Sequence, residues 1–334
     1  MSQQTSSLRK GFVDIQVNGF LGIDFSEPGL TLDQVRRVTF ELRDRGTLAY
    51  CPTVITSPWT TYEQNLPVLA QAHEEPDLKP HLLGIHLEGP FISPKDGARG
   101  AHPKEATRPP DRSLTARLIE LAENQVSIMT LAPELEGAIE LIRFLVDQKI
   151  TVAIGHHLAT RDQIRTACDE GATCATHLGN GIPNMIPRHP NPIWDQLDEE
   201  RLLLSLITDG HHLPDSFIRV VTRYAADDRL VIVSDSSPLA GLPPGSYQTF
   251  GQDVVLEESG LLWNPRGEYL VGSSYSLLQC MNYLAGLDVL GEEELWTVGF
   301  DRPLALLGVT LNPDDYQELP PISWEDGRFS IANN

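Results

Sequence analysis

The segment Gly84-Ile-His-Leu-Glu-Gly-Pro90 decides the fold, because it is an apolar run that ends in a carboxylate and a turn. Four later apolar runs end in the same way, each on a His or an Asp. They are Ile-Gly-His156, Ala-Thr-His177, Ile-Thr-Asp-Gly-His-His212 and Val-Ile-Val-Ser-Asp235. In eight-stranded α/β barrels the active site collects at the C-terminal ends of the strands. These repeated polar ends therefore predict such a barrel.

Strand-like and helical patterns alternate over residues 11–235. The strand candidates are 11–17, 47–55, 82–88, 126–132, 150–155, 172–177, 202–208 and 230–234. Helical periodicity lies between most of them, for example at 31–45, 112–124, 136–148, 160–170 and 214–226. The alternation predicts a parallel sheet with right-handed crossovers, and eight units suggest closure into a (β/α)8 barrel of the TIM type. A doubly wound open sheet is the alternative, although it usually binds ligands at one switch point.

Residues 236–272 interrupt this rhythm. Turn signals at Gly241-Leu-Pro-Pro-Gly245 and Glu257-Glu-Ser-Gly260 flank strand-like runs, so we expect a β-hairpin excursion after the eighth strand. Later elements are expected as helices near 274–285, 292–297 and 301–308 and a strand at 328–331. The predicted organisation is an N-terminal extension at 1–10, a barrel at 11–309 and a C-terminal tail at 310–334.

The bulk composition excludes some classes of function. The chain has 334 residues, 41% of them apolar, and a formal net charge of −21. Such a charge repels phosphate backbones, so no nucleic-acid partner is expected. No apolar run reaches the ~18 residues that a membrane span needs, and the first ten residues lack an apolar leader segment. Four cysteines without CxxC spacing indicate buried free thiols. We therefore expect a soluble cytoplasmic protein without a membrane partner.

Glu88, His156 and His177 are the candidate metal ligands. Each alone has an ordinary explanation, a capping carboxylate or a structural histidine. Together at strand ends they favour a Glu/His/His zinc site with an open position for water, whose pKa zinc would lower to about 7. Asp235 could take a proton from that water and pass it to a leaving group. It could equally cap the next segment, because Asp-Ser-Ser-Pro also reads as a turn.

A series of further segments stands in a recognisable order between residues 11 and 308. They are Gly11-Phe-Val-Asp-Ile-Gln-Val-Asn-Gly19, Pro52-Thr-Val-Ile-Thr56, Gly84-Ile-His-Leu-Glu-Gly-Pro90, Gly100-Ala-His-Pro103, Thr130-Leu-Ala-Pro-Glu134, Gly155-His156, Thr176-His-Leu-Gly-Asn180, Asp209-Gly-His-His212, Ser234-Asp235 and Gly272-Ser-Ser274. In this order they resemble the N-acetylglucosamine-6-phosphate deacetylases of the amidohydrolase superfamily.

The resemblance implies deacetylation of N-acetylglucosamine 6-phosphate to glucosamine 6-phosphate and acetate by metal-activated water. It makes Asp235 the general base and acid, and His102 the residue that polarises the acetyl carbonyl. It implies one divalent metal ion per chain on the three ligands above, with zinc expected and iron, cobalt and manganese also suited. The implied sugar-phosphate binders are Asn180, Gly181, Arg188 and His212. A homodimer is implied too, in which the arginine reaches the phosphate of a neighbouring subunit.

The chain departs from the pattern of the superfamily at several positions. Gln16-Val-Asn18 stands where many relatives carry a His-x-His pair for a second metal. Neutral amides are poor zinc ligands, so the single-metal branch is expected. His157 follows His156 where relatives carry serine, but strand alternation turns it away from the metal. Relatives also carry a small β-sandwich, of which residues 310–334 would supply at most a remnant strand.

Two alternatives to this activity remain. The same chemistry could act on a related acylated amino sugar, phosphorylated or not. A catalytically silent sugar-phosphate-binding protein is suggested by the missing His-x-His pair and the missing sandwich. It is opposed by the joint presence of five residues, namely Glu88, His102, His156, His177 and Asp235.

Overall fold

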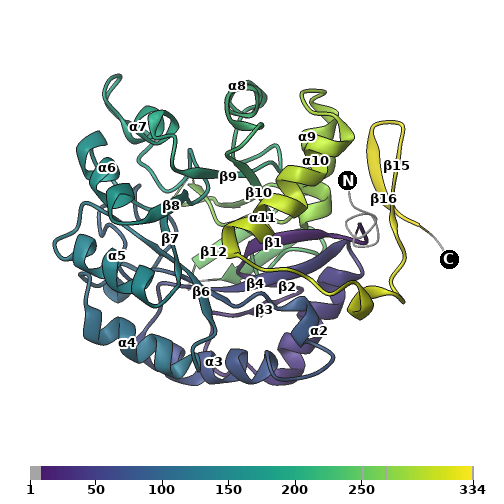
Figure 1. Cartoon of the computed structure of the whole chain (residues 1–334), viewed down its shortest axis with the longest axis horizontal. Helices are drawn as coiled ribbons and strands as arrows, with labels where there is room; N and C mark the ends of the chain where they lie inside the picture. Colours follow the sequence, from purple (N-terminus) through teal and green to yellow (C-terminus); the bar gives the residue numbers. More distant parts are fainter. Residues whose placement is uncertain (1–8, 250–251, 268, 333–334) are drawn as a thin grey trace.

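Eight parallel strands form the central sheet of the computed structural model, which describes residues 9–249, 252–267 and 269–332 (Figure 1). Neighbours in the sheet follow the order of the chain. The strands are β1 (Phe12–Val17), β4 (Thr47–Ile55), β5 (Ile85–Glu88), β6 (Val126–Leu131), β7 (Thr151–Ile154), β8 (Ala172–Ala175), β9 (Leu203–Ile207) and β10 (Leu230–Val233). All eight predicted strands are confirmed.

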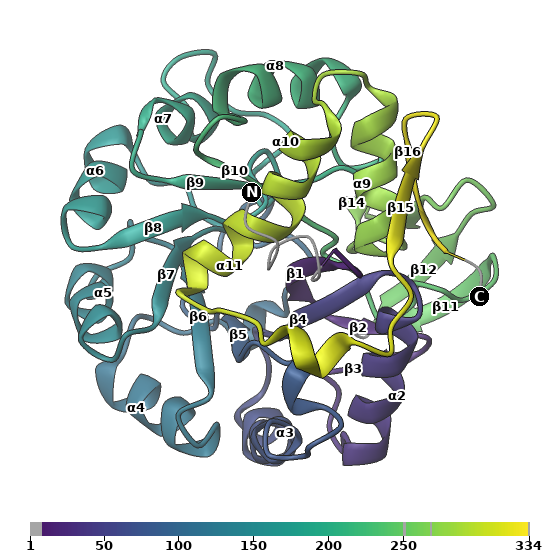
Figure 2. The ribbon, with the colours of Figure 1, turned by 45° about the vertical axis from the view of Figure 1, so that its right-hand side comes forward.

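The sheet closes between its first and last strands. Val17 bridges Ser236 in parallel, and the backbone N–H of Asn18 donates to the carbonyl of Ser236 at 2.9 Å. Lower in the same seam, the N–H of Ser234 donates to Oδ1 of Asp14 at 3.2 Å. Figure 2 shows the strands as a ring with the helices outside them. The TIM-type barrel is therefore confirmed, and the open doubly wound sheet is not observed.

An outer layer of helices covers the strands because each helix carries one apolar face. In α2, Val35, Val38 and Leu42 are buried at helical spacing, and Thr31 and Gln34 form a capping box at its start. Each such buried side chain stabilises the packing by roughly 1.5–3 kcal/mol. The layer consists of α2 (Leu32–Arg43), α3 (Trp59–Ala72), α4 (Arg112–Leu121), α5 (Ala138–Asp147), α6 (Arg161–Asp169), α7 (Pro192–Asp198) and α8 (Asp215–Ala225).

Short elements lie in the connections between strands and helices. They are β2 (Gly19–Phe20), β3 (Ile23–Asp24), η1 (Lys79–His81) and η2 (Lys104–Ala106). β2 and β3 pair as a small antiparallel ladder directly after β1. This ladder forms part of the loop that begins at Asn18, beside the C-terminal mouth of the barrel.

The C-terminal part of the chain covers the opposite, N-terminal end of the barrel (Figure 2). Phe12 at the start of β1 stacks on Trp296 with ring centroids 4.6 Å apart, and Phe329 meets Phe12 edge-on at 5.0 Å. The predicted helices and the strand at 328–331 are confirmed. The elements here are α9 (Leu277–Gly286), α10 (Glu292–Trp296), the π-helical turn η3 (Thr297–Asp301), α11 (Arg302–Leu307), η4 (Pro313–Tyr316), β15 (Ile322–Glu325) and β16 (Arg328–Ile331).

The excursion after β10 is confirmed and is larger than the expected hairpin. β11 and β12 form that hairpin, and two shorter strands extend it to a four-stranded antiparallel sheet. The strands are β11 (Gly245–Thr249), β12 (Gln252–Leu256), β13 (Leu262–Asn264) and β14 (Tyr269–Leu270). A small apolar core of its own holds this sheet, built from Leu239, Val254, Leu256, Leu262 and Val271. Within the described ranges, no helix combines the length and apolar character required to cross a membrane.

Candidate active site and metal centre

The candidate residues stand at the C-terminal ends of the strands, as predicted. Glu88 is the last residue of β5, while His156, His177 and Asp235 follow β7, β8 and β10. The last three have φ angles of 51°, 33° and 49°, in the left-handed region that non-glycine residues rarely adopt. Such conformations persist only where the surrounding structure enforces them, and they cluster at active sites.

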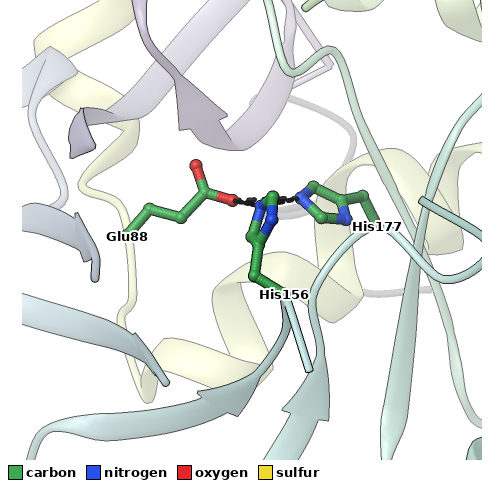
Figure 3. Close-up of side chains that lie close together, drawn as sticks. All are labelled: Glu88, His156 and His177. Atoms are coloured by element: carbon green, nitrogen blue, oxygen red, sulfur yellow. Dashed lines mark hydrogen bonds and ion pairs between the residues drawn. The ribbon is translucent and has the colours of Figure 1, made fainter. Parts of the chain in front are cut away.

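Three side chains converge on one point at the bottom of the barrel mouth (Figure 3). Nε2 of His156 and Nε2 of His177 lie 3.1 and 3.0 Å from Oε1 of Glu88, and 3.0 Å from each other. In a tetrahedral zinc site with bonds of about 2.0–2.1 Å, ligand atoms lie roughly 3.3 Å apart. The three donor atoms, all within 4.8 Å of one another, therefore fit a divalent metal ion.

Protonation of the cluster also fits a metal. Nδ1 of His156 lies 3.0 Å from the carbonyl of Ala98, so Nδ1 carries the proton and Nε2 keeps its lone pair for a metal. Nε2 of Gln16 donates to Oε1 of Glu88 at 3.0 Å.

Asp235 lies beside this cluster as a group that can take up and release a proton. Burial, with the nearby charge of Glu88, raises the pKa of Asp235 to about 6. The side-chain amide of Asn18 donates to Oδ1 of Asp235 at 2.7 Å. A carboxyl group whose pKa lies near neutrality suits general acid–base catalysis. The sequence could not decide between this role and a cap, and the buried position beside the metal ligands favours acid–base chemistry.

His102 reaches the site from the long loop after β5. The backbone N–H of Thr56 lies 3.4 Å from Nδ1 of His102, which makes Nδ1 the acceptor and leaves the ring proton on Nε2. Nε2 lies 4.0 Å from Oε2 of Glu88. Burial and the neighbouring His156 lower the pKa of His102 well below its usual value. His102 is therefore a neutral hydrogen-bond donor at the site.

His212 forms a buried pair with Asp209 after β9. Its Nδ1 lies 2.7 Å from Oδ2 of Asp209, whose Oδ1 accepts the backbone N–H groups of His211 and His212 at 2.9 Å. Burial works against the imidazolium, but the carboxylate outweighs it and raises the pKa of His212. His212 lies on the wall of the cavity, where the raised pKa favours its protonated, hydrogen-bond-donating form.

A cavity of about 770 Å³ contains these groups. Asn180 and Gly181 line it directly after β8. Gly181 has φ +60°, and a Cβ atom there would lie 2.9 Å from Nδ1 of His156, so only glycine fits this close approach. The rest of the wall is partly apolar, with side chains from the β8–α7 connection and the four-stranded sheet, including Ile182, Ile186, Ile193, Leu261, Trp263 and Leu270.

Arg188 is the one candidate that lies apart from the cavity. It is exposed on the β8–α7 connection. Among the described residues, no lysine or arginine lines the cavity.

Two other histidines near the ligands have structural partners. Nδ1 and Nε2 of His86 contact the carbonyl of Ile15 at 3.0 Å and the hydroxyl of Thr130 at 2.8 Å. Nδ1 of His157 accepts the N–H of Ala159 at 3.1 Å. His157 is not part of the converging cluster, in agreement with the prediction that strand alternation turns it away.

Sequence reasoning treated Gln16 and Asn18 only as replacements for metal ligands. The structure shows that each amide donates a hydrogen bond to a carboxylate, Gln16 to the candidate ligand Glu88 and Asn18 to the candidate acid–base group Asp235. The spacing of Gln16-Val-Asn18 could have predicted that the two amides point to the same face, because alternate residues at a strand end do so. It could not have predicted their partners. The partner carboxylates come from β5 and from the end of β10, far away in the chain.

Comparisons with known proteins identify relatives of the chain. No family model matches the chain. It is 30% identical over 298 residues to an N-acetylgalactosamine-6-phosphate deacetylase of Escherichia coli O157:H7, covering 89% of this chain and 77% of the relative. It is 33% identical to the N-acetylglucosamine-6-phosphate deacetylase of Danio rerio, with 90% and 75% covered.

A solved structure shares the whole barrel. It is a mutant of N-acetyl-D-glucosamine-6-phosphate deacetylase from Mycobacterium smegmatis in complex with N-acetyl-D-glucosamine-6-phosphate. The TM-score is 0.81 at 27% identity, with 90% of this chain and 77% of that chain covered. With a matching barrel and relatives at 30% identity or more over most of their length, the chain belongs to the N-acetylglucosamine-6-phosphate deacetylase family of amidohydrolases.

Proposed function

We propose that this protein hydrolyses the acetamide of N-acetylglucosamine 6-phosphate to give glucosamine 6-phosphate and acetate. The observation that best supports this proposal is the convergence of Glu88, His156 and His177 in one cavity. The same cavity holds a neutral hydrogen-bond donor, His102, and a group that can carry a proton, Asp235. A sugar-binding protein has no need for a buried acid–base group beside three metal-ligating atoms. The relatives named above carry deacetylase names.

One divalent ion per chain, zinc by our proposal, would be held by Glu88, His156 and His177. Iron, cobalt and manganese suit the same nitrogen and oxygen ligands. The bound ion would supply Lewis acidity for the carbonyl and lower the pKa of water. The Gln16 amide, which donates to Glu88, would fix the orientation of that carboxylate.

The remaining chemistry falls to side chains of this protein. Nε2–H of His102 donates to the acetyl carbonyl oxygen and stabilises the negative charge that develops there. Ionised Asp235 accepts a proton from the attacking water as the new C–O bond forms. It returns that proton to the sugar nitrogen as the C–N bond breaks, which yields the amine and acetate.

Phosphate binding calls for cationic donors, and among the described residues that line the cavity His212, whose pKa the carboxylate of Asp209 raises, is the candidate for this role. We propose a homodimer in which Arg188 of the partner subunit supplies the second cation, because a guanidinium can bind phosphate through two hydrogen bonds. Exposed apolar side chains beside Arg188 support such an interface. Met185 is 89% exposed and Trp194 is 53% exposed. Asn180 and the backbone of Gly181 would bind the sugar.

The galactosamine epimer is the second candidate substrate, because the relative from Escherichia coli O157:H7 is named for it. The two sugars differ only in the orientation of one hydroxyl group. Four buried free cysteines support a reducing, cytoplasmic place of action for either reaction.

The test combines elemental analysis with an acetate-release assay on one purified sample. The substrates are the 6-phosphates of N-acetylglucosamine and N-acetylgalactosamine, with unphosphorylated N-acetylglucosamine as the control. About one metal ion per chain and release from the first substrate would support the proposal. Faster release from the galactosamine epimer would reassign the sugar. Metal without release from either phosphate would overturn deacetylation of amino-sugar phosphates.

A further inference from the structure

Asn18 occupies a fixed position at the mouth of the barrel. It follows β1, it is 5% exposed, and it lines the cavity. Its backbone N–H donates to Ser236 at 2.9 Å, and its carbonyl accepts the N–H of Phe25 at 3.1 Å. These bonds tie the residue to the barrel seam on one side and to the β2–β3 ladder on the other. The side chain therefore has a defined place beside the reacting groups.

The two ends of the Asn18 amide differ in their partners. Nδ2 donates to Oδ1 of Asp235 at 2.7 Å. An ionised carboxylate only accepts hydrogen bonds, so it fixes which end of the amide faces it. Oδ1 of Asn18 is buried and has no hydrogen-bond partner among the residues that the structure describes. A buried acceptor without a partner costs free energy, which a donor on a ligand in the cavity would recover.

We propose that Oδ1 of Asn18 accepts the N–H of the scissile amide while Nδ2 holds Asp235. This inference rests on the proposed function, because it assigns a donor on the substrate of that reaction. A secondary amide carries one N–H on the atom that becomes the leaving group. A bond from that N–H to Asn18 places the nitrogen beside the carboxylate that protonates it. The same bond persists in the product amine after the C–N bond breaks.

Such a contact makes a chemical prediction that a purely structural role does not. The 2-O-acetyl ester of glucose 6-phosphate has the same shape but an oxygen in place of the N–H. The ester therefore has nothing to donate to Asn18, and its alkoxide leaving group depends less on protonation. Loss of Asn18 removes the contact with Asp235 on both substrates but removes an N–H contact only on the amide, so it should slow hydrolysis of the amide much more than hydrolysis of the ester.

The test compares Asn18→Leu with the wild-type enzyme on the amide and on the ester. Leucine keeps the size of the side chain and removes both polar ends. We expect kcat on the amide to fall at least about 30-fold, as for a lost hydrogen bond to a reacting group, with KM changed by less than about 3-fold. On the ester we expect a fall in kcat at least about 10-fold smaller than on the amide, because only the contact with Asp235 is lost there, and metal content should not change.

Asn65→Leu is the matched control. Asn65 is a buried asparagine on α3, outside the cavity, whose Nδ2 bonds the carbonyls of Phe25 and Glu27 at 2.9 and 2.7 Å. Its loss should lower the melting temperature and leave kcat unchanged on both substrates. A second variant, Asn18→Asp, keeps an acceptor but loses the donor and places a charge beside Asp235. We expect it to lose amide turnover without losing the fold.

The outcomes separate this inference from the proposed function. If the wild type turns over the amide and Asn18→Leu loses amide and ester hydrolysis equally, Asn18 acts only through Asp235 or the fold, and the proposed contact with the substrate N–H is wrong. If both enzymes turn over the amide equally, the contact does not exist. If the wild type releases no acetate from any amino-sugar phosphate, the proposed function fails and this inference fails with it.

Discussion

The two ends of the barrel are built on opposite principles. At the N-terminal end, Phe12, Trp296 and Phe329 fill the space with aromatic rings that are nearly or fully buried. At the C-terminal mouth, buried polar side chains converge, and three residues there have left-handed backbone angles. The same eight strands connect both ends. In barrels of this kind, residues at the N-terminal face serve stability and the C-terminal ends of the strands carry the active site.

The largest expected effect is a loss of catalysis at the C-terminal mouth of the barrel, with the aromatic packing at the N-terminal end left intact. Asp235→Asn should reduce kcat by about 10²–10⁴-fold, because the amide cannot accept a proton from water. Metal content and melting temperature should stay near the wild-type values. In the wild type, turnover should fall as pH falls through about 6, since protonation of Asp235 removes the base. The measurements are acetate release against pH and elemental analysis.

Near wild-type turnover of Asp235→Asn would remove this residue from the mechanism. A conservative comparison is Asp235→Glu, which keeps the carboxyl group but moves it. It should recover part of the turnover and restore the acidic limb of the pH profile. Recovery of neither would indicate that the shape of the pocket, and not the proton carrier, was damaged.

The second effect is a loss of stability at the N-terminal end of the barrel, with the active site at the C-terminal mouth left intact. Trp296→Ala should lower the free energy of unfolding by about 3–5 kcal/mol, because it removes a buried ring that contacts Phe12 and Phe329. Turnover per folded molecule should not change. Denaturant unfolding and active-site titration check both statements. Trp296→Phe is the matched variant and should cost clearly less, since much of the ring contact remains.

The third prediction concerns the surface beside the mouth. Arg188→Ala should raise KM for the phosphorylated sugar by roughly 10- to 100-fold, the usual cost of a lost hydrogen bond between charged groups. KM for unphosphorylated N-acetylglucosamine should change little. Arg117→Ala, which removes an exposed arginine from α4, is the control and should leave both KM values unchanged.

A mixing experiment decides whether Arg188 acts across a dimer. In hybrids of Arg188→Ala and Asp235→Asn subunits, one site would combine an intact Asp235 with Arg188 of the partner subunit. Turnover at low substrate should then exceed that of either variant alone. If hybrids form and no recovery occurs, Arg188 does not act across the interface.

The smallest expected effect tests how much a surface ion pair adds to the stability of the N-terminal end of the barrel. The ion pair between Arg9 and Glu293, with N–O distances of 2.8 and 2.6 Å, lies on the surface beside Trp296. Glu293→Gln should lower the free energy of unfolding by less than about 1 kcal/mol, because exposed ion pairs contribute little. Chemical denaturation measures this. A fall in the free energy of unfolding as large as that of Trp296→Ala would mean that charge, not aromatic packing, stabilises the N-terminal end of the barrel.

The sequence predicted the barrel and the convergence of the three candidate metal ligands because both follow from local signals. An apolar run that ends in a polar residue marks a strand and its C-terminal end together, so Glu88, His156 and His177 could be placed on one edge. The excursion was underestimated, since β13 and β14 have only three and two residues and show no periodicity of their own. These two strands are too short for an alternating pattern to be recognised in the sequence.

Contacts between distant segments could not be predicted. The tautomer of His156 depends on the carbonyl of Ala98, and that of His102 depends on the N–H of Thr56. The bond between Asn18 and Asp235 joins the end of β1 to the end of β10 across the closing seam. No spacing along the chain encodes these partners, because only closure of the barrel brings them together.

The left-handed angles at His156, His177 and Asp235 have a consequence for the history of such enzymes. Each Cβ there carries a steric penalty on the order of 1–2 kcal/mol, which glycine would not. At these three positions, selection for thermal stability would therefore favour glycine, whereas selection for turnover would favour the present side chains. A lineage that no longer needs the reaction could gain a sturdier shell by discarding those side chains first.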